Sequence, residues 1–221
     1  MKCRMHSFFE LHDPHAFLGL HSTPYGKVIR IFQPQNKKIY IDLLGQKLEA
    51  VSDYGLFEFS VPQETQPLDY KIYTTGKEKF HDPYVFSPTF GELDAYLFNQ
   101  GVHYKIYQVM GGRLCAHQGC RGAKFTVWAP NARGVSVVGD FNCWDGRVHP
   151  LRSLGSSGVW EIFIPGIEEG ALYKFEIRTE KEEIFLKADP YAYAMELRPS
   201  TASILVDIDH FSWRDQVWQA Q

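Results

Sequence analysis

The chain has 221 residues, 44% of them hydrophobic and 22% charged, which is ordinary for a folded globular protein of one large domain or two of about 100 residues. The 23 basic and 26 acidic residues give a formal net charge of −3 without any basic block, and this argues against nucleic acid as a partner. No apolar run approaches the roughly 18 residues of a membrane span, and residues 1–13 contain no apolar signal-peptide core, so no membrane partner and a cytoplasmic location are expected.

The first half of the chain predicts short antiparallel strands. In residues 54–62, Phe57, Phe59 and Val61 alternate with Glu58 and Ser60, as in a strand with one face in the core and the other in solvent. The predicted strand segments and the motif that closes them are IRIFQP at 29–34, YGLFEFSVP at 54–62, LDYKIY at 68–73 and HDPYVF at 81–86. Gly, Pro and Asn between such runs favour turns.

A helical segment is predicted next, in residues 91–112. His103, Ile106, Tyr107 and Met110 recur at helical spacing, and two glycines follow as a stop signal. We expect this short helix to act as a hinge or spacer that docks the first half of the chain. Residues 113–123, RLCAHQGCRGA, are expected to form a loop.

The second half repeats the pattern of the first. The matching segments are FTVWAP at 125–130, SGVWEIFIP at 157–165, ALYKFEI at 171–177 and ADPYAY at 188–193, in the same order as in the first half. Period-two alternation predicts that Trp160, Ile162 and Ile164 share one strand face. The fold class expected is therefore all-β, with two tandem immunoglobulin-like β-sandwich domains joined by a short helical segment. The domains span 1–112 and 113–221.

Metal and catalytic chemistry find little support in the sequence. The clusters around His12, His15 and His21, and around Cys115, His117 and Cys120, do not complete a zinc ligand set, so no metal or cofactor is expected. The four irregularly spaced cysteines predict free thiols. The acidic residues Glu168, Glu169, Asp140 and Asp145 lie in predicted turns, and no phosphate-binding or nucleophile motif is present, so no catalytic residues are expected.

The stretch VVGDFNCWDG, residues 137–146, places Trp144 among turn-forming residues. The offset between the two copies grows from 96 to 103 across this region, so about seven residues, Trp144 among them, form an insertion in the second copy. A Trp ring stacks on the C–H face of a sugar, and Asn142 and Lys174 are expected to supply polar partners. The alternative is that Trp144 is a core residue, as Trp is highly buried on average.

The segments FTVWAPNARGVSVVGDFNCWDGRVHPLR, SGVWEIFIPGIEEGALYKFEI and KADPYAYAMELRPSTASIL resemble the second N-terminal domain of bacterial 1,4-α-glucan branching enzymes, a carbohydrate-binding module of family 48. The first copy is similar to the additional N-terminal sandwich of the longer enzymes, through DPHAFLGLH, HDPYVF and GELDAYLFNQGVHYKIYQVMGG. The resemblance covers roughly residues 10–207.

The resemblance implies a role in glycogen biosynthesis, where branching enzymes form α-1,6 branches with an α-amylase-type barrel whose motifs this sequence lacks. The chain alone is therefore expected to be inactive, with α-1,4-glucan and the catalytic barrel as partners. Carried over residue by residue, the sugar site comprises Trp144, Asn142 and Lys174, with Phe185 and Leu186 where a second aromatic residue is usual. Two alternatives remain, a structural docking module whose Trp144 loop fills a groove on the barrel and a stand-alone glycogen-binding regulatory module.

Overall fold

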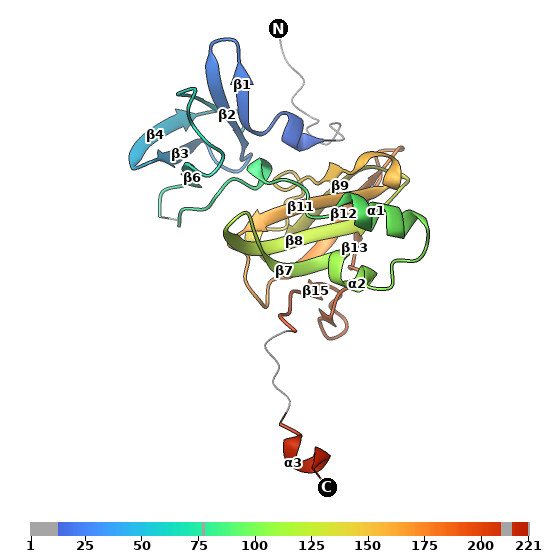
Figure 1. Cartoon of the computed structure of the whole chain (residues 1–221). Helices are drawn as coiled ribbons and strands as arrows, with labels where there is room; N and C mark the ends of the chain where they lie inside the picture. Colours follow the sequence, from blue (N-terminus) through green and yellow to red (C-terminus); the bar gives the residue numbers. More distant parts are fainter. Residues whose placement is uncertain (1–12, 77, 209–213, 221) are drawn as a thin grey trace.

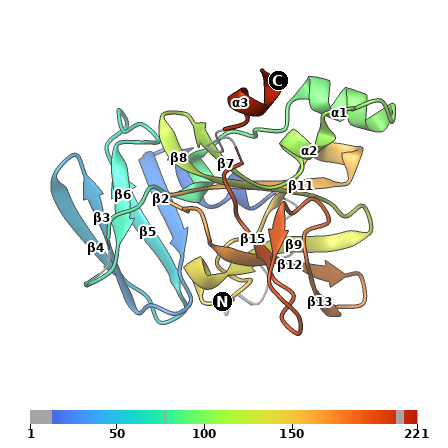
Figure 2. The same cartoon turned by 90° about the horizontal axis from the view of Figure 1, so that it is seen from below.

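The computed structural model describes residues 13–76, 78–208 and 214–220, with the side chain of residue 217 excepted. Two β-sandwiches lie side by side (Figures 1 and 2), as the strand pattern predicts. Within the described residues, no helix has both the length and the apolar character needed to cross a membrane.

The first sandwich is built from two three-stranded sheets. Strand β2 pairs with β1 and β5 in one sheet, and β3 pairs with β4 and β6 in the other. The strands are β1 (Gly19–Thr23), β2 (Gly26–Phe32), β3 (Lys38–Leu43), β4 (Gln46–Val51), β5 (Leu56–Val61) and β6 (Tyr70–Tyr73). The predicted inward residues Phe57, Phe59 and Val61 are buried between the sheets, and Glu58 and Ser60 are exposed.

The second sandwich is also built from two antiparallel sheets. Strand β8 pairs with β7 and β11 in one sheet, and β12 pairs with β9, β13 and β15 in the other. The first sheet contains β7 (Gly111–His117), β8 (Cys120–Trp128), β10 (Arg152–Ser153) and β11 (Val159–Pro165). The second contains β9 (Ala132–Gly139), β12 (Leu172–Thr179), β13 (Ile184–Lys187), β14 (Ala194–Met195) and β15 (Ser203–Ile204). Short 3-10 turns occur at Pro14–Ala16, Pro83–Val85, Asp140–Asn142 and Gly155–Ser157.

The prediction of a loop over residues 113–123 is wrong, because these residues form the β7–β8 hairpin. Gln118 and Gly119 make its two-residue turn with φ values of 47° and 81°, between His117 and Cys120. Gly122 is required because a Cβ there would lie 2.3 Å from the carbonyl oxygen of Ile164 on β11. A glycine that allows two strands to approach closely cannot be distinguished from a loop glycine by sequence alone, which is why a loop was predicted here.

The connector, residues 86–110, packs on the second sandwich and not on the first. Its helices are α1 (Glu92–Asn99) and α2 (Ile106–Val109), so the helix expected around 103–110 is present only as one short turn; a further short helix, α3, spans Gln216–Gln219. Phe90 and Met110 form a small core with Val159 of β11. The expectation that this segment docks the first sandwich is therefore wrong.

The connector also explains why both faces of β11 are buried. Trp160, Ile162 and Ile164 face the sandwich core as predicted, while Glu161 on the other face is completely buried. Its carboxylate accepts hydrogen bonds from the backbone N–H of Thr89 at 2.7 Å and of Phe90 at 2.6 Å, and from the Thr89 hydroxyl at 3.2 Å. These charge-assisted bonds fix the connector to the sheet.

The two sandwiches share part of one hydrophobic core. Leu18, Phe32 and Tyr84 from the first half belong to the buried cluster that contains the core of the second sandwich. The Tyr84 hydroxyl donates to the carbonyl oxygen of Val148 at 3.0 Å, and the Gln35 amide donates to the Asp145 carboxylate at 3.1 Å. Both of the latter contacts reach the segment around Trp144, so the first sandwich bears directly on that loop.

Candidate carbohydrate-binding site

The Trp loop, residues 140–148, occupies the place of a tight turn in the first sandwich. There, β3 and β4 are joined by Leu44 and Gly45 alone. In the second sandwich the segment 149–151 pairs with β9 as β4 pairs with β3, through Val137 N–H to His149 O at 3.1 Å and Leu151 N–H to Val135 O at 2.8 Å. Residues 140–148 exceed that turn by the seven residues expected from the sequence offset, so the insertion is confirmed.

Asn142 organises the inside of the Trp loop. Its side chain is only 6% exposed, and its carbonyl oxygen accepts the backbone N–H of Gly139 at 2.9 Å. Its amide nitrogen donates to Val137 O at 2.9 Å and lies 3.0 Å from His149 Nδ1. These contacts occupy both ends of the amide, so the Asn142 side chain is not available to a ligand. The prediction that Asn142 contacts sugar is therefore not retained. Its role is to hold the loop in shape.

Trp144 lies at the outside of the loop, on strained backbone. Cys143 and Trp144 both have positive φ, 55° and 59°, in the left-handed region that costs a non-glycine residue of order 1 kcal/mol. The Trp144 backbone N–H donates to Gly139 O at 3.0 Å, and its indole N–H donates to Asp140 Oδ1 at 3.0 Å. The side chain is nevertheless 39% exposed. The surroundings therefore maintain an unfavourable conformation that presents a Trp to solvent.

The loop covers the outer face of the β9–β12 pair. A Cβ at Gly146 would lie 2.4 Å from the Glu176 carboxylate of β12, which places the loop directly against this strand. The outward residues of β9 beneath it, Ser136 and Val138, are buried. Lys174 is paired with Val138 and belongs to the same face as Glu176. The fold thus brings the Trp loop and Lys174 to one surface.

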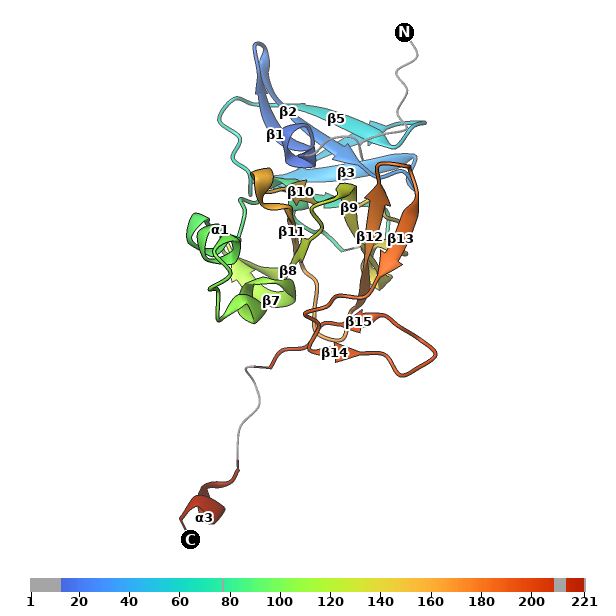
Figure 3. The same ribbon diagram turned by 90° about the vertical axis from the view of Figure 1, so that its right-hand side faces the viewer.

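The register of the edge strand β13 separates the two other predicted residues. Strand β13 runs beside β12 at the edge of the sheet (Figure 3). Leu186 is paired with Glu176 and lies on the outer face, whereas Phe185 is paired with Ile177 and lies on the opposite face. Directly opposed residues of an antiparallel pair share a face. Leu186 therefore lies on the same surface as Lys174, and Phe185 does not.

Two further residues of this surface were not predicted. Ile184 pairs with Arg178, so it lies on the outer face with Leu186, and both are 53% exposed. Thr201 accepts a hydrogen bond from the Lys174 ammonium at 2.7 Å. The alternation of Ile184 and Leu186 was a readable signal, but the contact of Thr201 with Lys174 is long-range and has none. We name Trp144, Lys174, Thr201, Ile184 and Leu186 the outer-face set.

The titratable groups at the loop are tuned by burial and by one ion pair. Burial lowers the pKa of His149 to about 4, so the imidazole that faces Asn142 is neutral. Hydrogen bonds from Arg147 lower the pKa of Asp145 to about 2, so this carboxylate is charged where Gln35 contacts it. Burial under the loop raises the pKa of Glu176. The loop therefore has a neutral interior and an Asp145–Arg147 ion pair at its rim.

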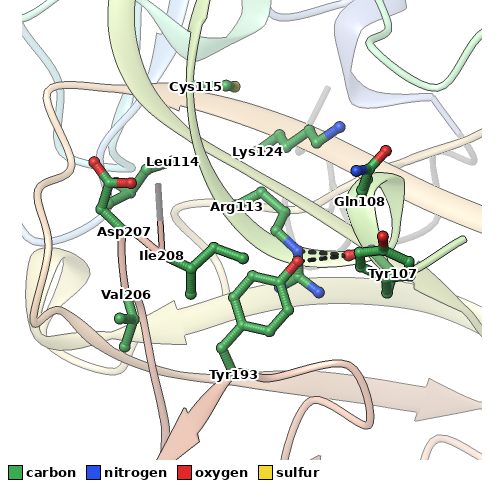
Figure 4. Close-up of a pocket in the computed structure, with 10 residues that line it drawn as sticks. All are labelled: Tyr107, Gln108, Arg113, Leu114, Cys115, Lys124, Tyr193, Val206, Asp207 and Ile208. Carbon is green, nitrogen blue, oxygen red and sulfur yellow. Dashed lines mark hydrogen bonds between the residues drawn. The ribbon is translucent and has the colours of Figure 1, made fainter. Parts of the chain in front are cut away.

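Another hollow, of about 240 Å³, lies between α2, β7 and the chain that follows β15 (Figure 4). Arg113 crosses it and stacks at 3.8 Å from the Tyr193 ring centre. Its guanidinium donates to three backbone carbonyl oxygens, those of Tyr107, Gly112 and Tyr191. These contacts fasten the connector to the second sandwich, so the guanidinium of Arg113 is already occupied by protein carbonyl oxygens.

Among the described residues, no group of three or more His, Cys, Asp or Glu side chains could hold an ion, and His12 lies outside them. Cys115, Cys120 and Cys143 are free thiols as expected, whereas Cys3 lies outside the described residues.

Two family models match the two sandwiches. Residues 110–192 match carbohydrate-binding module 48, described as the isoamylase N-terminal domain. Residues 8–84 match the N-terminal domain of the alpha-1,4-glucan branching enzyme GlgB. The boundary between the two matches lies in the connector, and the module contains the Trp loop and β13.

Relatives extend the match over nearly the whole chain. A 1,4-alpha-glucan branching enzyme GlgB from Protochlamydia amoebophila is 54% identical over 95% of this chain and 29% of that protein, and one from Chlamydia caviae is 45% identical over 93% and 29%. The ligand-free PulA structure from Klebsiella pneumoniae is 28% identical over 44% of this chain and 9% of that chain, with a TM-score of 0.37. The chain thus spans under a third of the length of the relatives it matches. It is homologous to the N-terminal region of 1,4-alpha-glucan branching enzymes, and its second sandwich matches the carbohydrate-binding module 48 model.

Proposed function

We propose that this chain binds α-1,4-glucan on the outer face of the second sandwich and positions it for branch formation by an α-amylase-type barrel. The observation that carries the proposal is Trp144, a half-exposed aromatic ring held on strained, left-handed backbone by a buried scaffold. Strain of this kind persists where the surrounding structure maintains it, and it clusters at ligand sites. The first sandwich has no counterpart of this loop, because Leu44 and Gly45 alone join β3 and β4 there.

The chemistry of the outer-face set suits a neutral sugar. The Trp144 ring, with the exposed Ile184 and Leu186, offers apolar surface for the C–H faces of pyranose rings. The Lys174 ammonium uses one of its three donors on the hydroxyl of Thr201, so its other N–H groups remain for sugar hydroxyls. An apolar platform with a few fixed polar groups at its border is the usual composition of a small-ligand site.

The relatives indicate which glucan. The proteins that match most of this chain are 1,4-alpha-glucan branching enzymes, and the matching module is of the carbohydrate-binding type. A non-catalytic region that holds the acceptor or donor chain would raise its local concentration at the active site of such an enzyme. We assign the catalytic step to the barrel and none to this chain.

Affinity electrophoresis through glycogen-containing gels tests the proposal. Trp144→Ala is expected to weaken retardation, with an apparent Kd at least about tenfold higher, because the apolar platform is lost. Trp218→Ala is the matched control, since this Trp is 76% exposed on α3 and lies outside the set. Equal retardation of wild type and Trp144→Ala removes Trp144 from the sugar site. In that case a purely structural role for the loop, docking on the barrel, becomes the better explanation.

A further inference from the structure

A cleft of about 570 Å³ lies between the two sandwiches, on the inner side of the Trp loop. The first sandwich contributes the β2–β3 loop with Gln33, Gln35 and Asn36, and the segment after β6 with Phe80. The second contributes Phe141 to Cys143 and the loop after β11. The two neighbours lie on different sides of the Trp loop, since Cys143 lines the cleft and Trp144 does not.

The cleft contains polar side chains that can hydrogen-bond to the hydroxyl groups of a ligand. The side chains of Gln33 and Asn36 are half-buried and make no hydrogen bond to the rest of the described chain. Each amide offers two N–H donors and a carbonyl acceptor. Amides at a cleft wall that lack protein partners match a ligand that carries both donors and acceptors, as sugar hydroxyls do.

The charges of the cleft exclude an anionic ligand. Its lining, all of it from the described part of the chain, contains no Lys or Arg, and burial lowers the pKa of its only His, His149, to about 4. Glu78 and Glu168 add negative charge at the rim. A phosphate or a nucleotide would meet like charges and no cation. The half-buried rings of Phe80 and Phe141 supply the apolar surface that a neutral sugar needs.

We propose that the cleft between the sandwiches is a second binding site for a short α-glucan segment. The ligand class rests on the proposed function, but the location does not, because no residue of the outer-face set lines the cleft. The cleft volume falls within the range of about 300–1,000 Å³ of small-ligand sites, enough for about two or three glucose units. The first sandwich then contributes directly to glucan binding through Gln33 and Asn36.

Cys143 provides the probe for the test, because its exposed thiol lines the cleft. The rate of Cys143 alkylation by iodoacetamide is followed by mass spectrometry with and without maltotriose, in wild type, in Trp144→Ala and in the double variant Gln33→Ala/Asn36→Ala. Cys120 at the β7–β8 turn, away from the cleft, is the internal reference. Maltotriose at about five times its Kd is expected to slow Cys143 alkylation about sixfold if the occupied cleft shields the thiol.

The proposal requires this protection in wild type and in Trp144→Ala, and its loss in the Gln33/Asn36 variant. Protection that disappears in Trp144→Ala and survives in the Gln33/Asn36 variant comes from the outer face and overturns the cleft site. Absence of protection in all three proteins also overturns it. Neither result depends on glycogen retardation, so failure of the cleft and failure of the outer-face site are distinguishable.

Discussion

Replacing Asn142 with Ala tests whether this side chain holds the Trp loop in place. The change deletes a buried amide that accepts from Gly139 N–H and donates to Val137 O and toward His149 Nδ1. The Gly139 N–H loses its partner inside the loop, which costs about 1–3 kcal/mol, and each lost amide contact adds about 1 kcal/mol. The expected loss is about 3 kcal/mol of unfolding free energy.

For a chain of this length each kcal/mol lowers Tm by about 2–4 °C, so Asn142→Ala is expected to lower Tm by roughly 9 °C. Thermal unfolding followed by circular dichroism measures it. Asn36→Ala is the matched control, because that amide makes no hydrogen bond to the described chain and its loss is expected to stay within about 0.5 kcal/mol. Glycogen retardation should weaken in Asn142→Ala as well, since Trp144 loses its support. A fall in Tm under about 2 °C, or equal falls in both variants, would refute the argument for Asn142.

Three further changes test the rest of the structure. Burial lowers the pKa of His149 to about 4, so the stability that neutral His149 contributes is full above the unfolded pKa near 6.5 and is lost as pH falls. Between pH 7.5 and 5 the wild type should therefore lose about 2 kcal/mol more unfolding free energy than His149→Asn. Urea unfolding at each pH measures this, and parallel pH profiles of the two proteins would contradict it. Gly122→Ala brings a Cβ to 2.3 Å from the carbonyl oxygen of Ile164 and should lower the unfolding free energy, measured in urea, by about 2–3 kcal/mol. Gly119→Ala is the control, because only its positive φ is strained, and it should cost about 1 kcal/mol. Equal costs would exclude the steric explanation. Glu161→Gln replaces the two carboxylate oxygens that accept the backbone N–H groups of the connector with a single amide oxygen and an NH₂ group. Amide hydrogen exchange at residues 89 and 90 should therefore accelerate about tenfold or more. Unchanged exchange would mean that apolar packing alone holds the connector.

The sequence by itself determined the architecture of the sandwiches. Strict alternation placed Phe57 and Phe59 inward, and the same period placed Ile162 in the second core. This works because a strand has two faces, so a local pattern of apolar and polar residues states which face is buried. The internal repeat fixed the order of the paired strands, and the growth of its offset located the insertion that contains Trp144.

The sequence failed where a residue serves distant partners. Glycines of the β7–β8 hairpin, Gly122 among them, looked like loop residues because the strand they pack against is remote in sequence. The apolar spacing of the connector indicated a helix, but the surface it covers, the outer face of β11, was not readable.

The candidate site shows the same division. The exposure of Trp144 on an inserted loop and the outward direction of Lys174 follow from local pattern and spacing. Only the tertiary structure decided that Asn142 is turned inward, because the groups that its amide satisfies appear when the loop closes. Register decided that Leu186 and not Phe185 shares the face of Lys174, since a shift of one residue in strand pairing exchanges the two faces. The cleft between the sandwiches was invisible in the sequence, because its walls come from separate segments, within 33–36, 72–83, 141–149 and 164–171, that meet only when the two cores join.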